Sequence, residues 1–348
     1  MNAPRILIVG PAWVGDMVMA HSLVQLLRQR YPQAVIDVLA PAWSLPLLAR
    51  MPHVRAGIEM PLKHGEIGLG VRWRLGRSLR GKYDQAMILP GSLKAALVPF
   101  FARIPQRTGY RGEHRYGLIN DMRPLDKARL PMAVQRFVAL GLAPNTPLPP
   151  PYFKPHLTTD PENQRRLIRT LGLRIEAPII AFMPGAEYGP AKQWPPEYFA
   201  QLARELIAQG KHIWVLGSAK DAPIGEHIAQ QAGPGAINLC GRTQLTDAID
   251  LLALAQACVT NDSGLMHIAA ALDIPSVALF GSSSPAHTPP LSDQAKVLYL
   301  DLTCSPCFKR VCPLGHTRCL REILPERVNA SLPLPERRSL QHHARPPA

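Results

Sequence analysis

The chain has 348 residues, of which 47% are hydrophobic and 18% charged, and its 39 Lys and Arg against 25 Asp and Glu give a formal net charge of +14. This length exceeds the roughly 250–300 residues at which one hydrophobic core stops growing, so we expect two domains. The apolar content excludes a disordered or fibrous chain. No apolar run reaches the length of about 18 residues that a membrane span needs. Residues 1–11 hold a short apolar strand and no signal peptide, so we expect a cytoplasmic protein.

The positive charge is concentrated in one part of the chain. Residues 51–140 hold sixteen Lys and Arg and six Asp and Glu, a local net charge of +10. Such a one-sided field favours an anionic partner: nucleic acid, an acidic lipid surface or a phosphorylated substrate. A solvated basic face with no specific partner is the alternative that charge alone leaves open. Aromatic residues make up only 6% of the chain and do not alternate with basic ones, so no nucleic acid is expected.

Short β-branched runs alternate with helical stretches along the chain. In the first half we expect helices at 16–30, 65–81 and 92–102, and strands at 5–9, 35–39, 83–89 and 107–110. In the second half we expect helices at 196–209, 245–257 and 264–272, and strands at 179–182, 212–216, 236–239, 258–260 and 276–280. Strands that alternate with helices of about 10–15 residues indicate βαβ units and a parallel sheet, so the fold class is α/β.

A proline-rich segment separates the two halves. Residues 144–155 contain six prolines, which excludes a helix or a central strand and predicts a semi-rigid linker. We therefore expect an N-terminal Rossmann-like domain over residues 1–150 and a C-terminal one over residues 156–330, with a ligand cleft between them. The tail, residues 331–348, contains four prolines and is expected to be disordered.

The first strand is followed by the turn Gly10-Pro11-Ala12-Trp13-Val14-Gly15-Asp16. Because it opens a helix, its backbone N–H groups should point into the cleft. The turn lacks the G-x-G-x-x-G spacing of a dinucleotide site, and no acidic residue follows the second strand, so an NAD site is not expected. Asp16 fits a helix N-cap. It equally fits a carboxylate at the cleft mouth that accepts a proton from a bound hydroxyl.

Two loops of the second half are suited to binding an anion. The loop 183–195 carries glycines and Lys192 just before a helix, a pattern that holds phosphate with amides and a point charge, although a solvated lysine is the plainer alternative. In the loop 260–267, Asp262 and Ser263 are expected to cap a helix starting at Gly264, whose free N–H groups form an anion site. His267 lies in its first turn, within reach of the same anion, although a lone histidine there is more often a core or surface residue.

Taken together, these loops resemble a known enzyme family. Residues 11–17, 184–195 and 261–267, together with Tyr110-Arg111-Gly112-Glu113 and the residues up to 121, are similar to the ADP-heptose:lipopolysaccharide heptosyltransferases. The resemblance extends from about residue 5 to residue 290. The form Trp13-Val14-Gly15-Asp16 resembles the second heptosyltransferase more than the first, which adds heptose directly to Kdo.

The resemblance implies a GT-B fold, with the donor on the C-terminal domain and the acceptor on the N-terminal one. It implies an inverting transfer from ADP-heptose to the first heptose of the acceptor Kdo-heptose-lipid A, with Asp16 as the catalytic base. Lys192 matches the donor-phosphate lysine of the family. Four residues match its ADP-heptose-binding loop: Asp262, Ser263, Gly264 and His267. With a looser match, Asp221 falls near the acidic residue that holds the ribose, and Thr243 near the adenine edge.

The leaving ADP needs stabilisation of its negative charge, which Lys192 and the helix at Gly264 would supply. No Asp-x-Asp metal motif occurs, so no divalent cofactor is implied. A possible structural metal is suggested by four cysteines in a C-x2-C-x4-C-x6-C array with His316 as a spare ligand: Cys304, Cys307, Cys312 and Cys319. Simple reduced thiols are the alternative, since disulfides are disfavoured in the cytosol.

Two other functions remain open from the sequence. One is another GT-B nucleotide-sugar transferase, such as heptosyltransferase I or III. The other is a non-catalytic nucleotide- or polyanion-binding module, in which the same motifs serve only as caps and turns. For a heptosyltransferase, the basic region that includes Arg72, Arg74 and Arg77 is interpreted as a face for the phosphate-bearing lipid acceptor, in peripheral contact with the cytoplasmic face of the inner membrane.

Overall fold

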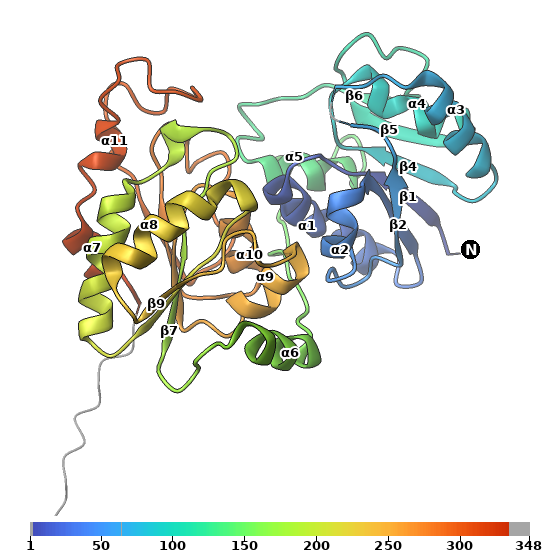
Figure 1. Cartoon of the computed structure of the whole chain (residues 1–348). Helices are drawn as coiled ribbons and strands as arrows, with labels where there is room; N and C mark the ends of the chain where they lie inside the picture. Colours follow the sequence, from blue (N-terminus) through green and yellow to red (C-terminus); the bar gives the residue numbers. More distant parts are fainter. Residues whose placement is uncertain (1–2, 64, 334–348) are drawn as a thin grey trace, which may run out of the picture.

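The computed structural model describes residues 3–63 and 65–333. Each half of the chain builds one six-stranded sheet in which all neighbouring strands are parallel (Figure 1). The N-terminal sheet has the order β3-β2-β1-β4-β5-β6. Its strands are β1 (Arg5–Val9), β2 (Val35–Pro41), β3 (Ala56–Met60), β4 (Gln85–Ile88), β5 (Gln106–Tyr110) and β6 (Asp121–Arg123).

The C-terminal sheet repeats this arrangement, with the order β12-β11-β10-β7-β8-β9. Counted from the start of its own half, each sheet has the strand order 3-2-1-4-5-6 of a Rossmann domain, so the expected α/β class with two Rossmann-like domains is confirmed. The strands are β7 (Ile179–Met183), β8 (His212–Val215), β9 (Ala236–Asn238), β10 (Ala257–Asn261), β11 (Ser276–Leu279) and β12 (Ala295–Leu298).

Helices connect the strands in both halves. The first half contains α1 (Val14–Arg30), α2 (Leu45–Leu48), α3 (Leu69–Ser78), α4 (Leu93–Phe101), α5 (Ala133–Leu140) and the short 3-10 helix η1 (Ala42–Ser44). The second half contains α6 (Pro161–Leu171), η2 (Pro190–Lys192), α7 (Pro196–Ala208), η3 (Ala219–Asp221), α8 (Ala222–Ala232), α9 (Leu245–Leu252), α10 (Gly264–Ala271), α11 (Arg318–Arg321) and α12 (Pro325–Asn329).

The central strands are buried on both faces. In β1, Ile6 and Ile8 belong to one buried cluster, while Leu7 and Val9 belong to another on the opposite face. This alternation follows from the two-residue period of a strand. A strand covered on both faces needs an unbroken apolar run, which is why β1 could be predicted from the sequence.

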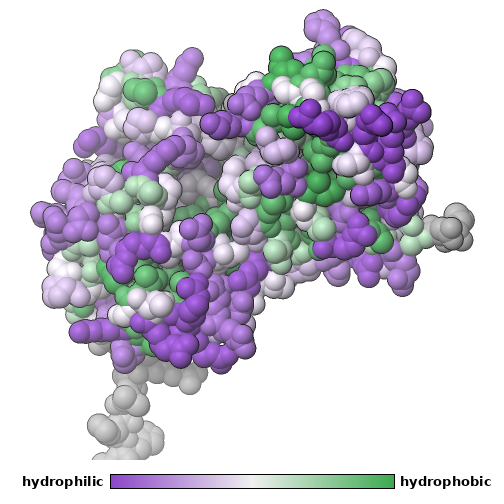
Figure 2. Space-filling model, turned by 45° about the vertical axis from the view of Figure 1, so that its right-hand side comes forward, coloured by the Kyte–Doolittle hydropathy of each residue, from purple (hydrophilic) through white to green (hydrophobic). Residues whose placement is uncertain are grey.

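One buried cluster is shared by the two domains. It combines the inner faces of both sheets with residues of α1, α5, α9 and α10, and α1 packs directly against α10. The outer face of the N-terminal sheet is covered by α3 and α4, and that of the C-terminal sheet by α7 and α8. The two sheets therefore flank a central helix layer, and the surface is hollowed between the domains (Figure 2).

The expected elements are present, with corrected ends. The helix predicted over 65–81 covers only Leu69–Ser78, and the one predicted over 245–257 ends at Leu252, before β10 begins. Several elements were not predicted: β3, β6, β12, α2, α5, α6, α8, α11 and α12. The missed strands are half-exposed and lie at or near sheet edges, so they lack the continuous apolar run that marks a central strand.

The predictions for the proline-rich linker and for the tail have different outcomes. Residues 141–160 contain no helix or strand, and the boundary placed at 144–155 stays a prediction. Most of the tail expected to be disordered, residues 334–348, lies outside the described residues. Its first residues correct the expectation, because Ser331 and Leu332 are buried and Leu332 packs into the C-terminal core. Within the described residues, no helix is both long and apolar enough to cross a membrane.

Candidate active site

The site lies where the two central helices begin. α1 follows β1 and α10 follows β10, at the points where the strand order of each sheet reverses, which is where open α/β sheets bind ligands. The two helix starts are in contact. A Cβ atom on Gly15 would lie 2.5 Å from the His267 ring, and one on Gly264 would lie 2.7 Å from the Val14 side chain. Only glycine permits this approach at both positions.

Asp16 stands in the first turn of α1. The N-cap position belongs to Trp13, so the interpretation of Asp16 as a helix cap is wrong. Burial raises the pKa of the Asp16 carboxyl, while the positive charges of His287 and Lys192 lower that pKa and the charge of Asp262 raises it. These three groups belong to the C-terminal domain, so Asp16 faces residues of that domain across the cleft. A carboxylate with a raised pKa is a stronger base than an exposed one, which suits proton abstraction.

Lys192 lies at the end of η2 and pairs with Asp262. Its Nζ is 2.5 Å from Asp262 Oδ2, and the Ser283 hydroxyl donates to the same oxygen. The carboxylate therefore positions Lys192, and the expectation that Asp262 caps α10 is wrong. The ammonium also lies 5.0 Å from the centre of the Tyr188 ring, within range of a cation–π contact.

Ser263 occupies the N-cap position of α10 without capping it. Its side chain makes no bond to the helix backbone, and among the described residues its buried Oγ has no hydrogen-bond partner. A buried hydroxyl without a partner is uncommon in folded proteins and calls for a partner such as a ligand. Together with the N–H groups that a helix start leaves unbonded, this hydroxyl is placed to donate to an anion, and the anion-binding role stays a prediction.

His267 is part of the contact between the domains. Its ring is buried, and burial lowers its pKa to about 4, so the imidazole is neutral near pH 7. It therefore offers no positive charge to a bound anion. The role of His267 at an anion site is limited to packing and hydrogen bonding. The structure brings together these loops of the two halves. The N-terminal half contributes Asp16, and the C-terminal half contributes Lys192, Asp262, Ser263, Gly264 and His267.

Asp221 and Thr243 lie farther along the C-terminal domain. The Asp221 carboxylate accepts hydrogen bonds from Ser218 N and Oγ at 2.8 and 2.7 Å. A Cβ atom on Gly185 would be 2.6 Å from that carboxylate, so Asp221 lies beside the loop that leads to Lys192. Thr243 is half-buried in the loop between β9 and α9. The ribose and adenine roles of these two residues stay predictions.

His287 is a site residue that sequence reasoning missed. It lies in the loop after β11, where its Nδ1 is 2.8 Å from the Pro131 carbonyl oxygen and its own carbonyl accepts the Ala133 N–H at 3.0 Å. It thus connects the C-terminal domain to the N-terminal one near Asp16, whose pKa its charge lowers. No motif surrounds it, and only the fold brings it to the cleft.

Comparison with known proteins identifies the family of the chain. Residues 72–318 match glycosyltransferase family 9 (heptosyltransferase). The chain belongs to this family. It is 52% identical to lipooligosaccharide heptosyltransferase 2 of Haemophilus influenzae, over 85% of this chain and 88% of that protein. It is 50% identical to lipopolysaccharide heptosyltransferase 2 of Salmonella typhimurium, over 93% and 96%. The structure of Escherichia coli ADP-heptose lps heptosyltransferase II superposes with a TM-score of 0.84 at 46% identity, over 94% of this chain and 97% of that one.

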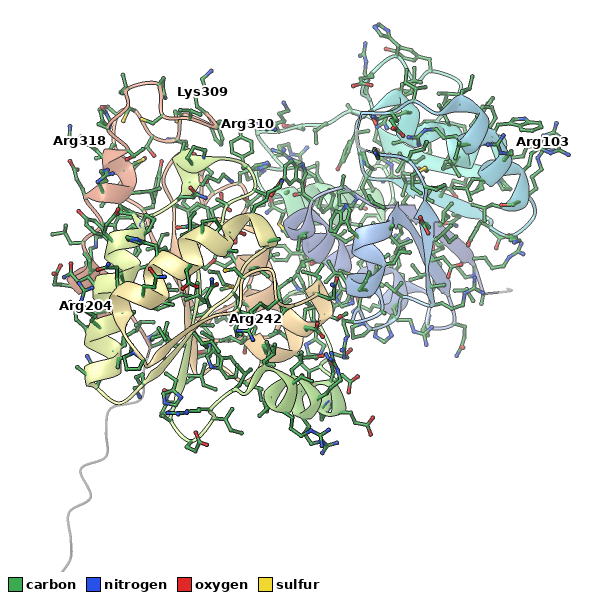
Figure 3. All side chains as sticks on the ribbon, in the orientation of Figure 1. Arg103, Arg204, Arg242, Lys309, Arg310 and Arg318 are labelled. Carbon is green, nitrogen blue, oxygen red and sulfur yellow. The ribbon has the colours of Figure 1, made fainter. Side chains whose placement is uncertain are left out.

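The basic region of this family 9 member is only partly a surface. Arg72 is buried and donates to the carbonyl oxygens of Ile67 at 2.6 Å and Lys94 at 3.1 Å. Arg115 is buried in the same way and donates to the Pro90 carbonyl at 2.6 Å. The interpretation of Arg72 as part of a solvent-facing basic patch is therefore wrong. Other arginines do reach the surface, such as Arg103 at the outer edge of the N-terminal domain (Figure 3).

The cysteine array forms a pocket and no metal centre. Its four cysteines line one small pocket together with His316. Within residues 3–63 and 65–333, however, no three His, Cys, Asp or Glu side chains converge as metal ligands, and all four cysteines are free thiols. Cys312 has a lowered pKa because neighbouring backbone N–H groups bond to it, whereas burial raises the pKa of Cys319 to about 11. The suggested structural metal is therefore not supported.

Proposed function

We propose that Asp16 is the general base of an inverting transfer of heptose from ADP-heptose to the first heptose of the lipopolysaccharide inner core. Heptosyl transfer is the activity of the family to which the chain belongs, so a non-catalytic binding module does not fit. Asp16 would take the proton of the acceptor hydroxyl as that oxygen attacks the anomeric carbon from the side opposite the leaving ADP.

The departing ADP gains negative charge as the glycosidic bond breaks. Lys192, held by Asp262 at 2.5 Å, supplies a positive charge at that position. The N–H groups at the start of α10 and the unpartnered Ser263 hydroxyl supply neutral donors. Donors that are fixed before the reaction stabilise developing charge at little reorganisation cost. Asp221 and Thr243 are proposed to hold the ribose and the adenine.

One observation carries the proposal more than any other. A carboxylate at the start of α1 and an anion-binding set at the start of α10 face each other from two domains, and the Asp16 pKa responds to both Lys192 and Asp262. This arrangement gives one base on the acceptor side and one leaving-group site on the donor side. An inverting transfer needs one of each.

The acceptor is proposed to be Kdo-heptose-lipid A. The similarity supports a second-heptose acceptor, since the chain is about half identical to several heptosyltransferases 2. It is 31% identical to a heptosyltransferase 1 over 45% of the chain and 25% identical to a heptosyltransferase 3. Comparing transfer to acceptors that end in Kdo and in Kdo-heptose separates these activities. Because this acceptor is lipid-linked, we also place the enzyme in the cytoplasm, in peripheral contact with the inner membrane.

The test of the base is Asp16→Asn, assayed by ADP release and by the mass of the acceptor. We expect the turnover to fall by about 10²- to 10⁴-fold, the usual contribution of a general base, with ADP affinity and thermal stability unchanged. Asp293→Asn, which changes an exposed carboxylate of the C-terminal domain, is the matched control. Near wild-type turnover in Asp16→Asn would refute the assignment.

A further inference from the structure

Helix α3 presents large apolar side chains to solvent. Leu69 and Trp73 lie one turn apart on its outer face and are 56% and 43% exposed, and Ile67 just before the helix is 65% exposed. On the opposite face, Arg72 and Gly76 are buried against α4. A tryptophan and two aliphatic residues exposed close together form an apolar patch, and such patches mark interaction sites.

The same face of α3 is strongly basic. Arg77 lies one turn after Trp73, with its guanidinium 4.7 Å from the centre of the Trp73 ring, and Arg74 is exposed beside it. Residues 67–83 contain no Asp or Glu. The α3 face, which we define as Ile67, Leu69, Trp73, Arg74 and Arg77, therefore combines apolar anchors with cations that have no acidic neighbour in this segment.

The surroundings extend this face. A surface hollow of about 490 Å³ lies beside it, lined by Pro61, Val71, Leu75 and Ser78 together with Arg74. At the end of α4, Phe100 is exposed and Arg107 lies over its ring at 5.8 Å. Figure 2 shows apolar residues in patches on the N-terminal domain, bordered by hydrophilic ones. The apolar and basic character thus continues beyond a single helix.

We propose that the α3 face is a docking surface for an anionic lipid bilayer, where Trp73, Leu69 and Ile67 insert at the headgroup level and Arg74 and Arg77 contact lipid phosphates. Tryptophan and aliphatic side chains next to arginine are the combination that interfacial helices use, and basic residues near a membrane are attracted by its surface potential. Nucleic acid would use the arginines but leave the aliphatic anchors without a partner.

The position of α3 fits this occupant. The helix covers the outer face of the N-terminal sheet, on the side opposite the cluster shared with the C-terminal domain (Figure 1). Docking there leaves the contact between α1 and α10 unchanged. The inference rests on the proposed function, because a lipid-linked acceptor gives the enzyme a reason to bind the membrane, and it names the element that does so.

The experiment measures how the purified full chain partitions onto vesicles of phosphatidylcholine with 30% phosphatidylglycerol, and onto pure phosphatidylcholine. We expect binding to the anionic vesicles, weakened by salt as screening requires. One variant combines Leu69→Ser with Trp73→Ser, and a second combines Arg74→Glu with Arg77→Glu. Each should lower the partition coefficient by about tenfold or more. Arg174→Glu with Ile175→Ser, an exposed pair of the same kind on the C-terminal domain, should bind like the wild type.

Transfer to a water-soluble, deacylated acceptor separates this inference from the proposed function. The variant that combines Leu69→Ser with Trp73→Ser should retain wild-type turnover on that acceptor. A wild type that transfers heptose but does not bind anionic vesicles, or α3 variants that bind them as well as the wild type, would overturn the docking surface. Equal loss of binding in the C-terminal control pair would overturn it as well. A wild type that binds vesicles but transfers no heptose would refute the proposed function alone.

Discussion

Asp262 and Ser263, next to the start of α10, differ in how far the fold already satisfies their hydrogen-bonding groups. Asp262 accepts from Lys192 and Ser283, so removing it would leave a half-buried ammonium without its partner. The Ser263 hydroxyl, by contrast, has no partner among the described residues. A buried group that the fold leaves unsatisfied costs stability, and the Ser263 hydroxyl at the start of α10 is placed where a bound ligand would satisfy it. Removing the Asp262 carboxylate should therefore lower the stability, whereas removing the Ser263 hydroxyl should not.

We expect Ser263→Ala to weaken donor binding without destabilising the protein. The lost hydrogen bond, worth about 0.5–1.5 kcal/mol, should raise the KM for ADP-heptose by about 2- to 10-fold. The melting temperature should stay the same or rise, because an unsatisfied buried hydroxyl is removed. Steady-state kinetics with ADP-heptose and thermal melting measure the two quantities.

The matched control is Ser276→Ala, since the Ser276 hydroxyl in β11 is also buried and has no partner among the described residues. It should leave the KM unchanged, because the side chain is not at the start of α10. A clear drop in melting temperature for Ser263→Ala, with no change in KM, would contradict the ligand role.

Much of the site could be predicted because its residues follow strands. Asp16 and Lys192 come after apolar runs that mark β1 and β7, so their places at the sheet edges follow from the sequence. The roles within the site could not be predicted in the same way. Ser283 and His287 act through a loop that only tertiary packing brings to the cleft, and the pairing of Lys192 with Asp262 joins residues 70 positions apart.

Helix α1 does more than carry Asp16. Its polar side chains hold the segment that links the halves: Ser22 Oγ donates to the Phe153 carbonyl and Gln25 Nε2 to the Lys154 carbonyl, both at 2.6 Å. His21 accepts the His156 N–H on Nδ1 at 3.0 Å. Accepting this bond requires the Nδ1 atom to be unprotonated.

We expect acid to weaken this attachment. Burial lowers the pKa of His21 to about 4, below its usual 6.5, so the unfolded chain binds the proton more tightly. Stability should fall as the pH drops from about 6.5 towards 4, by about 3 kcal/mol for this histidine. Urea unfolding of the wild type and of His21→Gln at pH 7.5 and 5 measures this loss of stability. Burial also lowers the pKa of His267, but its contribution is the same in both proteins and cancels in the comparison. An equal loss on acidification would contradict the assignment.

The ends of α6 carry sequence signals that predict a helix. α6 begins with Asp160, whose side chain accepts from the N–H groups of Glu162 and Asn163, followed by Pro161. It ends at Gly172, which adopts the left-handed conformation with φ of 63°. These are the usual start and stop signals, so this helix was within reach of the sequence. The edge strand β3 was not, because its half-exposed residues carry no comparable signal.

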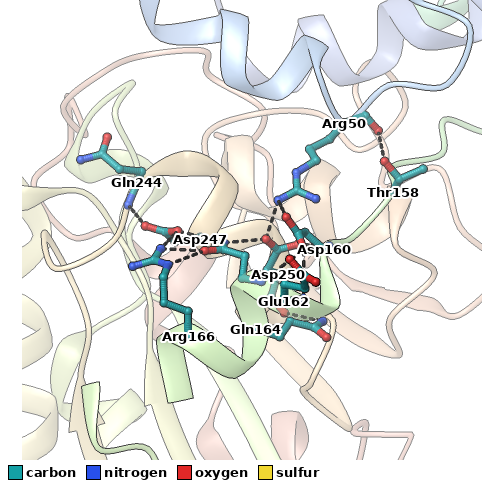
Figure 4. A network of polar contacts seen from close by, with 10 residues as sticks. Arg50, Thr158, Asp160, Glu162, Gln164, Arg166, Gln244, Asp247 and Asp250 are labelled. Carbon is teal, nitrogen blue, oxygen red and sulfur yellow. Dashed lines mark hydrogen bonds and ion pairs between the residues drawn. The ribbon is translucent and has the colours of Figure 1, made fainter. Parts of the chain in front are cut away.

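For the whole molecule, one polar network fixes how the two halves meet. Arg50, just after α2, reaches Asp250 of α9 at 2.6 Å (Figure 4). Asp250 is fully buried and also accepts from Asn163 Nδ2 at 2.7 Å and Asp160 N at 2.8 Å. The network lies at α6 and α9, apart from the helix starts that form the site. Because the network joins Arg50 of the N-terminal half to Asp250 of the C-terminal half, it supports the orientation in which Asp16 faces Lys192.

We expect Arg50→Ala to lower stability by about 3 kcal/mol, because it leaves a buried carboxylate without its positive partner. Since this ion pair joins the halves, calorimetry should show the unfolding transition broaden or divide, and kcat should fall although no catalytic group has changed. Arg166→Ala is the control from the same network. Arg166 pairs with Asp247 within the C-terminal half and is more than half exposed, so its loss should cost less than about 1 kcal/mol. Equal effects of the two variants on kcat would mean that the network does not set the domain orientation.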